Sequence, residues 1–589
     1  MALNPRIIVV GGGLAGLSAV IKIAEMGGQV DLFSIVPVKR SHSVCAQGGI
    51  NAAKNLKGEG DSTWQHFDDT IYGGDFLANQ PPVKAMCDAA PGIIDLLDRM
   101  GVPFNRTPEG LLDFRRFGGT LYNRTAFAGA TTGQQLLYAL DEQVRRYESE
   151  GKVKKYEHWE FLSAVLDSKQ ICRGICAMDL RSMEVRTFPA DAIIIATGGI
   201  GAIFGKSTNS VVCTGSAQSA LYQQGCYYAN GEFIQVHPTS IPGEDKLRLM
   251  SESARGEGGR VWVPKKPGDT RDPKSIPENE RWYFLEEWYP KYGNLVPRDV
   301  ATRAIFKVVY EYNLGIDGKP MVYLDLTHVD RKILDRKLEG ILEIYEKFVG
   351  DDPRETPMKI FPGMHYTMGG LWVDFKQATN IPGIYSAGES EYQYHGANRL
   401  GANSLVSCIF GGFVAGRAAV AYACNAAAAP NNGHFEAERK RQEEKNGMLT
   451  KAEGTENPFK LWRELGELMT KNCTVIRYNK ALQETDAKLC EMLERFQRIN
   501  MSDRLQWANT SIVFTRQLYN MLQLARVIAQ GAQMRDESRG AHYKPDFPDR
   551  DDKSWLKTTK AYFAPDADEP KFEFEPVDIS LIPPRPRKY

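Results

Sequence analysis

The chain has 589 residues, more than one hydrophobic core usually supports, so at least two folding units are expected. Charged residues make up 25% of it and apolar residues 42%, a composition that excludes a disordered chain. Lysine plus arginine equals aspartate plus glutamate at 73 each, so no net charge attracts the chain to nucleic acid or anionic lipid. The cysteines are scattered without a C-x-x-C pair, so no metal site is predicted.

The first predicted elements form a βαβ unit. The strand-like run from Arg6 to Val10 is followed by G-G-G-L-A-G, a helical pattern and a second strand, Q-V-D-L-F-S. Gly11, Gly13 and Gly16 fit G-x-G-x-x-G, in which the glycines allow a tight turn, approach of a pyrophosphate and packing of helix on strand. Because the motif lies between a strand and a helix, it favours dinucleotide binding over a structural turn. The strand begins almost at residue 1, so no secretory signal is expected, which indicates the cytoplasm.

The nucleotide that this unit binds is predicted to be FAD. An NAD site usually has an acidic residue at the end of the second strand, but Asp31 lies inside that strand, which ends at Ser34. Two further glycine turns, A-T-G-G near residue 198 and S-A-G-E near residue 388, follow apolar runs far downstream. Several such turns around one dinucleotide suit an extended FAD.

The three apolar runs that end in glycine predict one sheet that is interrupted by insertions. The fold class is therefore α/β, with a split Rossmann-like FAD-binding domain, an inserted α+β capping domain, a C-terminal helical bundle and an irregular C-terminal tail. The expected boundaries are 1–239 and 357–430 for the FAD-binding domain, 240–356 for the capping domain, 434–540 for the helical domain and 541–589 for the tail.

One stretch, C-I-F-G-G-F-V-A-G-R-A-A-V-A-Y-A-C-N from Cys408, is as apolar as a membrane span. Arg417 lies at its middle and glycine and alanine are frequent, so it is interpreted as a buried helix. No direct membrane span is predicted, and any membrane attachment would come through another polypeptide.

With these elements in place, the chain resembles the flavoprotein subunits of succinate dehydrogenase and fumarate reductase over essentially its whole length. The resemblance rests on these motifs: R-S-H-S-V-C-A-Q-G-G-I, V-H-P-T, S-A-R-G-E-G-G, R-D-V-A-T-R-A, H-Y-T-M-G-G, H-G-A-N-R-L-G-A-N-S-L and E-S-R-G-A-H.

The resemblance implies a covalent FAD. In that family the histidine of R-S-H is bonded to the 8α-methyl of the flavin, so His42 is the expected anchor, and the bond raises the flavin potential enough to oxidise an unactivated C–H. Glu389 resembles the carboxylate that binds the adenosine ribose. The expected cofactor-binding residues are Gly11, Gly13, Leu14, Ala15, Gly16, Ser34, Arg40, Ser41, His42, Gln47, Gly48, Gly49, Ala196, Thr197, Gly198, Gly388, Glu389, Ser404 and Leu405.

The resemblance also implies a site for a four-carbon dicarboxylate, which needs cations or strong donors at both ends. Arg399 and His365 are expected to bind one carboxylate, and His237 and Ser251 the other; the family more often has threonine at the position of Ser251. Phe117 is expected to offer the substrate backbone an apolar wall.

Proton transfer is the role that the resemblance gives to Arg298, with Glu252 and Arg255 as a relay to solvent. A guanidinium normally keeps its proton, so this role requires Arg298 to be buried, flanked by cations and coupled to Glu252.

The function implied is that of the catalytic subunit of a succinate:quinone oxidoreductase. The implied partners are an iron-sulfur subunit and a membrane anchor that carries a quinone site and haem b, with succinate and fumarate as substrates. The subunit would be peripheral on the cytoplasmic side of the bacterial inner membrane.

The alternative is a soluble fumarate reductase or an enzyme similar to L-aspartate oxidase. The aspartate oxidases are expected to have a carboxylate in place of Phe117 and to lack the equivalent of His42, which counts against them. A flavin-binding module without catalysis is a third possibility, but Arg298, Arg399 and His365 are all present. One departure from the family pattern is Ser216 in T-G-S-A, where aspartate is usual, and it puts one cofactor contact in doubt.

Overall fold

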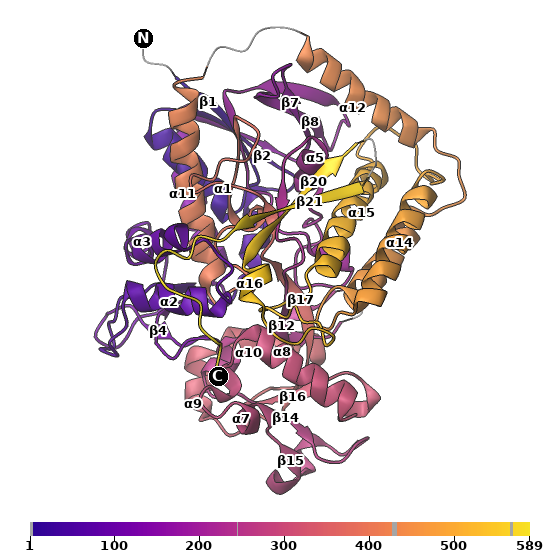
Figure 1. Ribbon diagram of the computed structural model, residues 1–589. Helices are drawn as coiled ribbons and strands as arrows, with labels where there is room; N and C mark the ends of the chain where they lie inside the picture. The colour runs from indigo at the N-terminus through magenta and orange to yellow at the C-terminus, as the bar shows by residue number, and fades with distance from the viewer. Residues whose placement is uncertain (1–3, 244–245, 427–432, 566–568, 589) are drawn as a thin grey trace.

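The structure is a computed structural model, and it describes residues 4–243, 246–426, 433–565 and 569–588. Figure 1 shows a broad upper body that contains both the N-terminal and the C-terminal thirds of the chain, and a smaller lobe below it from the middle of the chain.

A five-stranded parallel sheet forms the centre of the upper body, in the order β19-β10-β1-β2-β6. It confirms that the three apolar runs ending in glycine belong to one sheet, since Val10 of β1 pairs with Ile195 of β10, which pairs with Ser386 of β19. The strands are β1 (Arg6–Val10), β2 (Gln29–Ser34), β6 (Val153–Glu157), β10 (Ala192–Ile195) and β19 (Ile384–Ser386).

The two faces of this sheet are covered by different layers, because alternate side chains of a strand point to opposite faces. Ile7 and Val9 join a core with the helices of one face, whereas Ile8 and Val10 join the core of the other face. The first layer contains α1 (Leu14–Glu25), α3 (Gln80–Arg99), α4 (Thr132–Ser149) and α11 (Asn403–Ala423). The second contains the antiparallel sheet β7 (Trp159–Leu166), β8 (Cys172–Asp179) and β9 (Val185–Pro189).

α2 (Thr63–Gly73) packs on α3, and a small sheet, β3 (Ile50–Asn51), β5 (Thr125–Ala126) and β4 (Phe114–Arg115), lies beside them.

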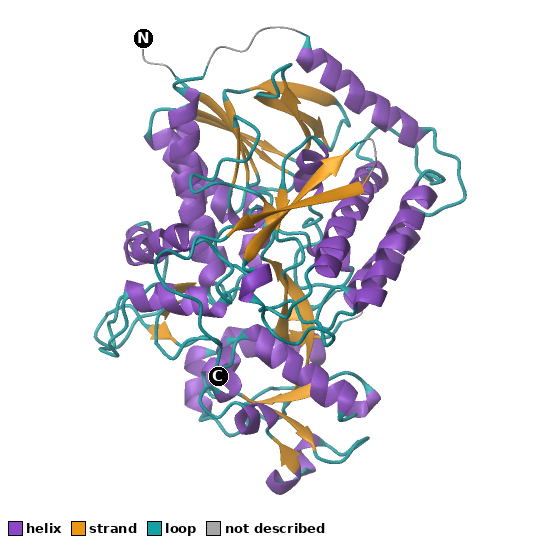
Figure 2. Cartoon of the chain, in the orientation of Figure 1, coloured by secondary structure: helices purple, strands orange, loops and turns teal. Residues whose placement is uncertain are grey.

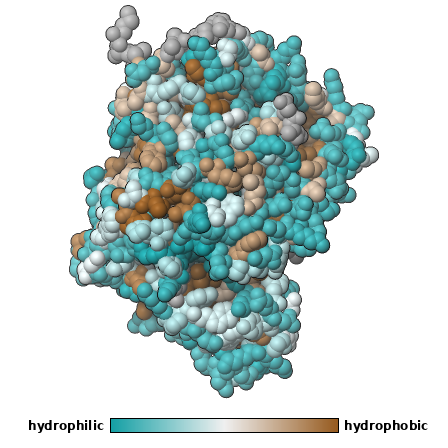
Figure 3. Space-filling model, in the orientation of Figure 1, coloured by the Kyte–Doolittle hydropathy of each residue, from teal (hydrophilic) through white to brown (hydrophobic). Residues whose placement is uncertain are grey.

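Helix α11 contains the membrane-like stretch. Among the described residues it is the one helix whose length and composition would suit a membrane span, but it packs along α1 inside the protein. A Cβ added to Gly412 would lie 2.3 Å from the carbonyl oxygen of Ala15, so the two backbones touch, while Arg417 is exposed. The face shown in Figure 3 is mainly hydrophilic, and its described hydrophobic residues form separate areas.

The lower lobe is built on a six-stranded sheet in the order β13-β12-β17-β16-β14-β15. β12 and β17 are long strands that run between the two bodies (Figure 2), and they end and begin close to the expected boundaries at 240 and 357. The strands are β12 (Ile234–Ile241), β13 (Arg248–Leu249), β14 (Arg260–Pro264), β15 (Arg281–Trp282), β16 (Val322–Asp325) and β17 (Met358–Thr367). The helices are α6 (Ser253–Gly256), α7 (Phe284–Trp288), α8 (Arg298–Phe306), α9 (Arg331–Lys337) and α10 (Glu339–Val349).

The helices predicted after residue 434 are present. α13, α14 and α15 pack on one another, α15 also packs on α5, and α12 lies across β7, β8 and β9. Their bounds are α5 (Ser216–Gln223), α12 (His434–Thr450), α13 (Pro458–Asn472), α14 (Asn479–Phe496) and α15 (Thr510–Met534).

The expectation of an irregular C-terminal tail is wrong. After α16 (Asp552–Trp555), β20 (Lys557–Ala564) and β21 (Glu569–Pro576) form a hairpin that joins β11 (Tyr228–Ala229) and β18 (Gly370–Leu371) in a four-stranded sheet. The alternation in K-F-E-F-E is a strand signal that the charge and proline content of the tail concealed. Pairing of Tyr228 with Ala561 supplies the backbone partners that a lone hairpin would lack.

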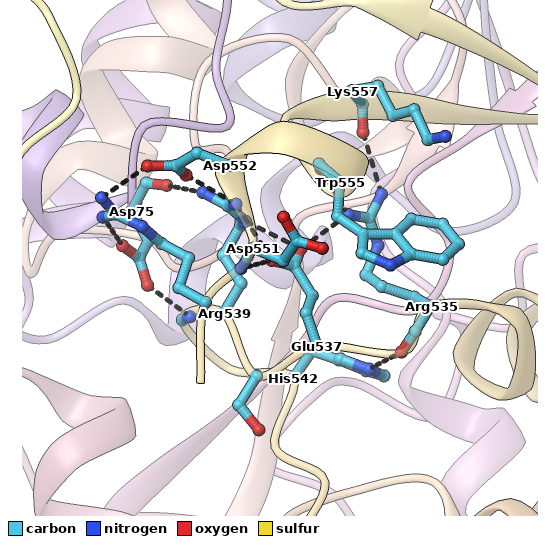
Figure 4. A network of polar contacts seen from close by, with 12 residues as sticks. Asp75, Arg535, Glu537, Arg539, His542, Asp551, Asp552, Trp555 and Lys557 are labelled. Carbon is cyan, nitrogen blue, oxygen red and sulfur yellow. Dashed lines mark hydrogen bonds and ion pairs between the residues drawn. The ribbon is translucent and has the colours of Figure 1, made fainter. Parts of the chain in front are cut away.

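A buried ion network holds the tail on the rest of the chain (Figure 4). Arg535 and Arg539 both donate to the carboxylate of Glu537, at 2.9 and 2.8 Å, and Arg539 also donates to Asp552 and to the backbone oxygen of Asp75. Because Arg535, Glu537 and Arg539 are nearly inaccessible to solvent, each charge has to be paired where it lies.

The contact between α1 and α11 predicts that Gly412→Ala destabilises the protein. The added methyl has no room beside the Ala15 carbonyl, and such overpacking costs about 1–3 kcal/mol. Gly447→Ala, on helix α12, is the matched control: a Cβ there meets no atom within 4 Å, so it should stabilise the helix by about 0.5–1 kcal/mol. Thermal unfolding midpoints check both, and a Gly412→Ala midpoint equal to that of the unchanged chain would contradict the close packing.

Candidate active site

One large cavity of about 440 Å³ lies at the carboxyl ends of β1, β2 and β10 and extends toward the lower lobe. Its volume falls within the range of roughly 300–1,000 Å³ of ligand sites, and its place is where open α/β sheets bind nucleotides. The lining includes most of the residues expected at the cofactor: Gly11, Gly13, Leu14, Ala15, Ser34, Ser41, His42, Gln47, Gly48, Gly49, Ala196, Thr197, Gly198, Glu389, Ser404 and Leu405.

The glycine loop forms the cradle that a pyrophosphate needs. Gly11 has φ +115°, and a Cβ there would lie 2.1 Å from the carbonyl oxygen of Ala196. Gly13 precedes the first turn of α1, and this positive helix end lies at the wall of the cavity and favours an anion, although the N–H of Leu14 already donates to the hydroxyl of Ser43 at 3.2 Å. The cradle therefore fits the diphosphate of FAD.

Two polar residues at strand ends mark different parts of the dinucleotide. Ser34 ends β2, where the adenosine ribose binds in such folds. Glu389 follows β19, and strand order places β10 and β1 between β19 and β2. Three strand spacings separate the two strands by about 14 Å. Glu389 accepts a hydrogen bond from the backbone N–H of Thr367 at 3.0 Å, and burial raises its pKa to about 7.

His42 lies on a short 3₁₀ turn, His42–Cys45, at the wall of the cavity. Its Nδ1 accepts from the backbone N–H of Ser210 at 3.2 Å, and its Nε2 lies 3.2 Å from the Nδ2 of Asn209. Burial, with a smaller contribution from Lys246, lowers its pKa to about 4, so the imidazole is neutral.

The residues expected to bind the dicarboxylate meet at the end of the cavity near the lower lobe. The rings of His237 and His365 are 5.1 Å apart, and Ser251 and Arg399 line the same space. Burial, followed by the charge of Arg298, lowers the pKa of both histidines well below the ordinary value, so both are neutral at neutral pH.

His237 is fixed as a hydrogen-bond donor. Its Nδ1 accepts from the backbone N–H of Thr239 at 3.2 Å, so the proton of the neutral ring is on Nε2. This Nε2 is buried and has no partner among the described residues. An unpaired buried donor is costly unless a ligand occupies it.

Arg399 is a buried cation without a counter-ion in the described part of the chain. It is 2% exposed, its Nε has no hydrogen-bond partner, and its guanidinium carbon lies 4.3 Å from the ring centroid of Tyr366. Burial and the charge of Arg298 lower its pKa. A buried positive charge of this kind favours an anionic ligand.

Arg298, Glu252 and Arg255 form a buried chain of ion pairs. Arg298 donates to one carboxylate oxygen of Glu252 at 2.9 and 3.1 Å, and Arg255 donates to the other at 2.5 Å. Burial alone would raise the pKa of Glu252, but the two arginines outweigh it, so its pKa lies below the ordinary value. Arg298 begins helix α8 and faces the cavity, whereas Arg255 lies behind Glu252.

Several predicted residues do not line the cavity. Arg40 is exposed, because the turn that buries Val38 points Arg40 outward. The ring of Phe117 is buried behind the wall, against Gly48 and Gly401. Gly16 and Gly388 serve packing instead: a Cβ on Gly16 would lie 1.8 Å from the carbonyl oxygen of Gly11, and one on Gly388 would lie 2.8 Å from the Cβ of Ala15.

Other residues of the site were missed by sequence reasoning. Gln235 accepts from Arg298 at 2.9 Å and donates to the carbonyl of Arg399, so it links the two arginines. Thr208 is hydrogen-bonded to His365 at 2.7 Å. Gln235 comes two residues before His237 in V-H-P-T, which was the one available signal; the others are brought in only by folding.

Comparisons with known proteins agree with this geometry. Residues 6–405 match the family described as "FAD binding domain", and residues 462–589 match "Fumarate reductase flavoprotein C-term". The succinate dehydrogenase flavoprotein subunit of Bacillus subtilis is 65% identical over 99% of this chain and 98% of its own length. The chain belongs to the succinate dehydrogenase and fumarate reductase flavoprotein family.

Solved structures of this flavoprotein family have the same fold. The chain superposes on a quinol fumarate reductase of Escherichia coli with a TM-score of 0.89 and 33% identity, covering 99% of this chain and 98% of that one. It superposes on a quinol-fumarate reductase with menaquinol molecules with a TM-score of 0.90 and 32% identity, covering 99% of each chain. The α/β fold class is thereby confirmed.

The ion pairs of Glu252 predict a large loss of stability for Glu252→Gln. Removing one partner leaves buried charge uncompensated, which costs about 3–5 kcal/mol. Because the pKa of Glu252 is depressed in the folded state, its contribution is present above the ordinary glutamate pKa and disappears as pH falls through the folded value.

Chemical denaturation at neutral and acidic pH measures this effect. The variant should be much less stable at pH 7, with a smaller difference in acid. Glu278→Gln is the control, since Glu278 pairs with Arg260 at the surface and its loss should cost about 1 kcal/mol or less. Equal effects of the two substitutions would contradict the assignment.

Proposed function

We propose that this chain is the catalytic flavoprotein subunit of a succinate:quinone oxidoreductase. It interconverts succinate and fumarate with FAD bound covalently through His42, and it passes the electrons to an iron-sulfur subunit. The observation that carries the proposal is Arg399, a buried cation without a counter-ion among the described residues, which shares one end of the cavity with two neutral histidines.

A dicarboxylate satisfies both unpaired groups of this end of the cavity. Arg399 offers a guanidinium fork to one carboxylate, with His365 beside it. The Nε2–H of His237 and the hydroxyl of Ser251 can donate to the other. Because both histidines are neutral, they donate hydrogen bonds to the carboxylates without adding positive charge that would oppose release of the product.

FAD, when bound, supplies the two-electron acceptor for hydride removed from the substrate. The chain binds the dicarboxylate at both ends, excludes water and moves the second hydrogen as a proton. Arg298 is the group placed for that proton, since it faces the cavity and is hydrogen-bonded to Glu252. Glu252 and Arg255 continue the chain of hydrogen bonds away from the cavity, which suits a relay.

The surroundings of His42 support a bond through Nε2. The lone pair of Nδ1 is engaged by the backbone N–H of Ser210, and a neutral imidazole has only one such lone pair. Nε2 therefore carries the proton of the neutral ring and is the nitrogen that would lose it on bonding to carbon; the Nδ2 of Asn209, 3.2 Å away, is itself a donor and cannot accept that proton.

Glu389 is proposed to bind the ribityl chain instead of the adenosine ribose. It follows β19, and the strand order places it about 14 Å from β2, where Ser34 marks the ribose position. The ribityl hydroxyls lie between the diphosphate and the flavin ring. They are therefore on the side of the diphosphate away from the adenosine ribose, which is the side of Glu389.

Electrons need a route out of this subunit. No group of histidine, cysteine and carboxylate side chains among the described residues could hold a metal ion, so a separate iron-sulfur subunit is proposed as the acceptor. A membrane anchor with a quinone site and haem b would complete the complex, with this chain on the cytoplasmic side of a bacterial inner membrane.

His42→Ser tests the covalent bond. The variant should keep FAD bound, but acid precipitation should release the flavin to the supernatant, whereas the unchanged chain should keep it on the peptide that contains His42. Without 8α-substitution the flavin potential falls, so succinate oxidation should fall more than fumarate reduction. Equal losses in both directions would contradict this role.

Arg298→Lys tests proton transfer. Lysine keeps the positive charge but cannot hold Glu252 and Gln235 at once, so turnover should fall at least about 10³-fold in both directions. Dicarboxylate binding, followed by the change in flavin absorbance with malonate, should weaken no more than a few-fold. Turnover within tenfold of the unchanged enzyme would remove Arg298 from the mechanism.

A further inference from the structure

A second unpaired group lies at the other end of the cavity, beyond Ser34. Trp159, Glu160 and Phe161, at the start of β7, line this end together with Gln517 of α15. Glu160 is 5% exposed, and one carboxylate oxygen, Oε1, accepts from the Nε2 of Gln517 at 2.8 Å. The other, Oε2, is buried without any hydrogen-bond partner in the described part of the chain.

This carboxylate is unusual in its surroundings. No ion pair joins Glu160 to any described lysine, arginine or histidine, and burial raises its pKa to about 7, against smaller opposing effects of Gln517 and Arg516. A buried acceptor that stays unsatisfied costs about 1–3 kcal/mol or more for a charged group. Its Oε2 therefore indicates a ligand that brings a hydrogen-bond donor.

The position of Glu160 identifies the part of FAD that would bring that donor. Ser34, at the end of β2, marks the adenosine ribose, and the ring of Trp159 lies 6.2 Å from that of Phe33 in the same strand. The cavity end around Glu160 thus lies on the adenine side of the ribose. The exocyclic amine of adenine is the N–H donor of that part of the molecule.

Glu160 lines the same cavity as Ser216, one of the two positions at which the resemblance to the family implies a different residue. Ser216, where the family usually has aspartate, begins α5 and lines the cavity, and its hydroxyl accepts from the Nδ2 of Asn520 at 2.7 Å. Gln517 and Asn520 are three residues apart on α15, so they share one face of that helix. Glu160 and Ser216 are therefore both held by side chains from one face of α15.

We propose that Glu160 is a specificity residue for FAD, which accepts a hydrogen bond from the adenine amine and replaces the carboxylate that Ser216 lacks. The carboxylate at this end of the cavity thus comes from β7 instead of α5, and both positions line the same cavity. The inference rests on the proposed function only in taking FAD as the cofactor.

The test measures reversible FAD binding by the full-length chain with His42→Ser. Two ligands are compared by fluorescence titration: FAD and its deaminated analogue, in which hypoxanthine replaces adenine and a carbonyl oxygen replaces the amine. The His42→Ser chain should bind FAD more tightly than the analogue, because the analogue places an oxygen against Oε2.

Adding Glu160→Ala should raise the Kd for FAD about 10- to 100-fold, as expected for a hydrogen bond to a charged group, and remove the preference over the analogue. Glu160→Gln keeps the shape and should lose part of the preference. Glu184→Ala, at an exposed glutamate close to β9, is the control and should change neither value.

The most decisive variant restores a carboxylate at position 216, where the family usually has aspartate. Glu160→Ala combined with Ser216→Asp should recover both the FAD affinity and the preference over the analogue. An unchanged Kd for Glu160→Ala, a preference that persists in it, or no recovery in the double variant would overturn the inference. If the His42→Ser chain bound no FAD at all, the proposed function itself would fail instead.

Discussion

The buried carboxylate of Glu252 is the interaction on which the arrangement of the two bodies at the site depends. It pairs with Arg255 and Arg298 within the lower lobe, and two glycines of the upper body close on it from the other side. A Cβ on Gly118 would lie 2.2 Å from one of its oxygens, and a Cβ on Gly401 would lie 2.7 Å from the other. Any side chain at either glycine would push the bodies apart, and loss of the carboxylate would leave two buried arginines facing each other.

This pairing also decides which charge is available to a ligand. Glu252 neutralises Arg298 and Arg255, whereas Arg399 forms no ion pair among the described residues: it packs against the face of Tyr366, and the charges of Glu252 and Glu389 act on it only through space. The cavity therefore carries an unbalanced positive charge at one end. At the opposite end, Glu160 is an unbalanced acceptor. A dicarboxylate would bring an anion to Arg399, and FAD would bring an N–H donor to Glu160, so the two ligands together satisfy both groups.

The position of Arg298 makes its assigned role physically reasonable. It is buried, it is close to a second arginine, and its hydrogen bonds run to Glu252 on one side and Gln235 on the other. A proton that enters the guanidinium from the cavity can thus leave through Glu252 in the same event, so no long-lived neutral arginine is required.

The sequence by itself determined the βαβ unit, the FAD cradle and the split of the central sheet, because these depend on apolar periodicity and on glycines that end apolar runs; the residues of the site were expected only from the resemblance of their motifs to a known family. It did not reveal the hairpin of the tail, whose strands are stable only beside Tyr228, more than 300 residues earlier in the chain. Tertiary structure alone turned Arg40 outward, buried Phe117 behind Gly48, and brought Gln235 to Arg298 and both Glu160 and Ser216 to one face of α15. Those contacts join side chains from separate elements, and no spacing along the chain encodes them.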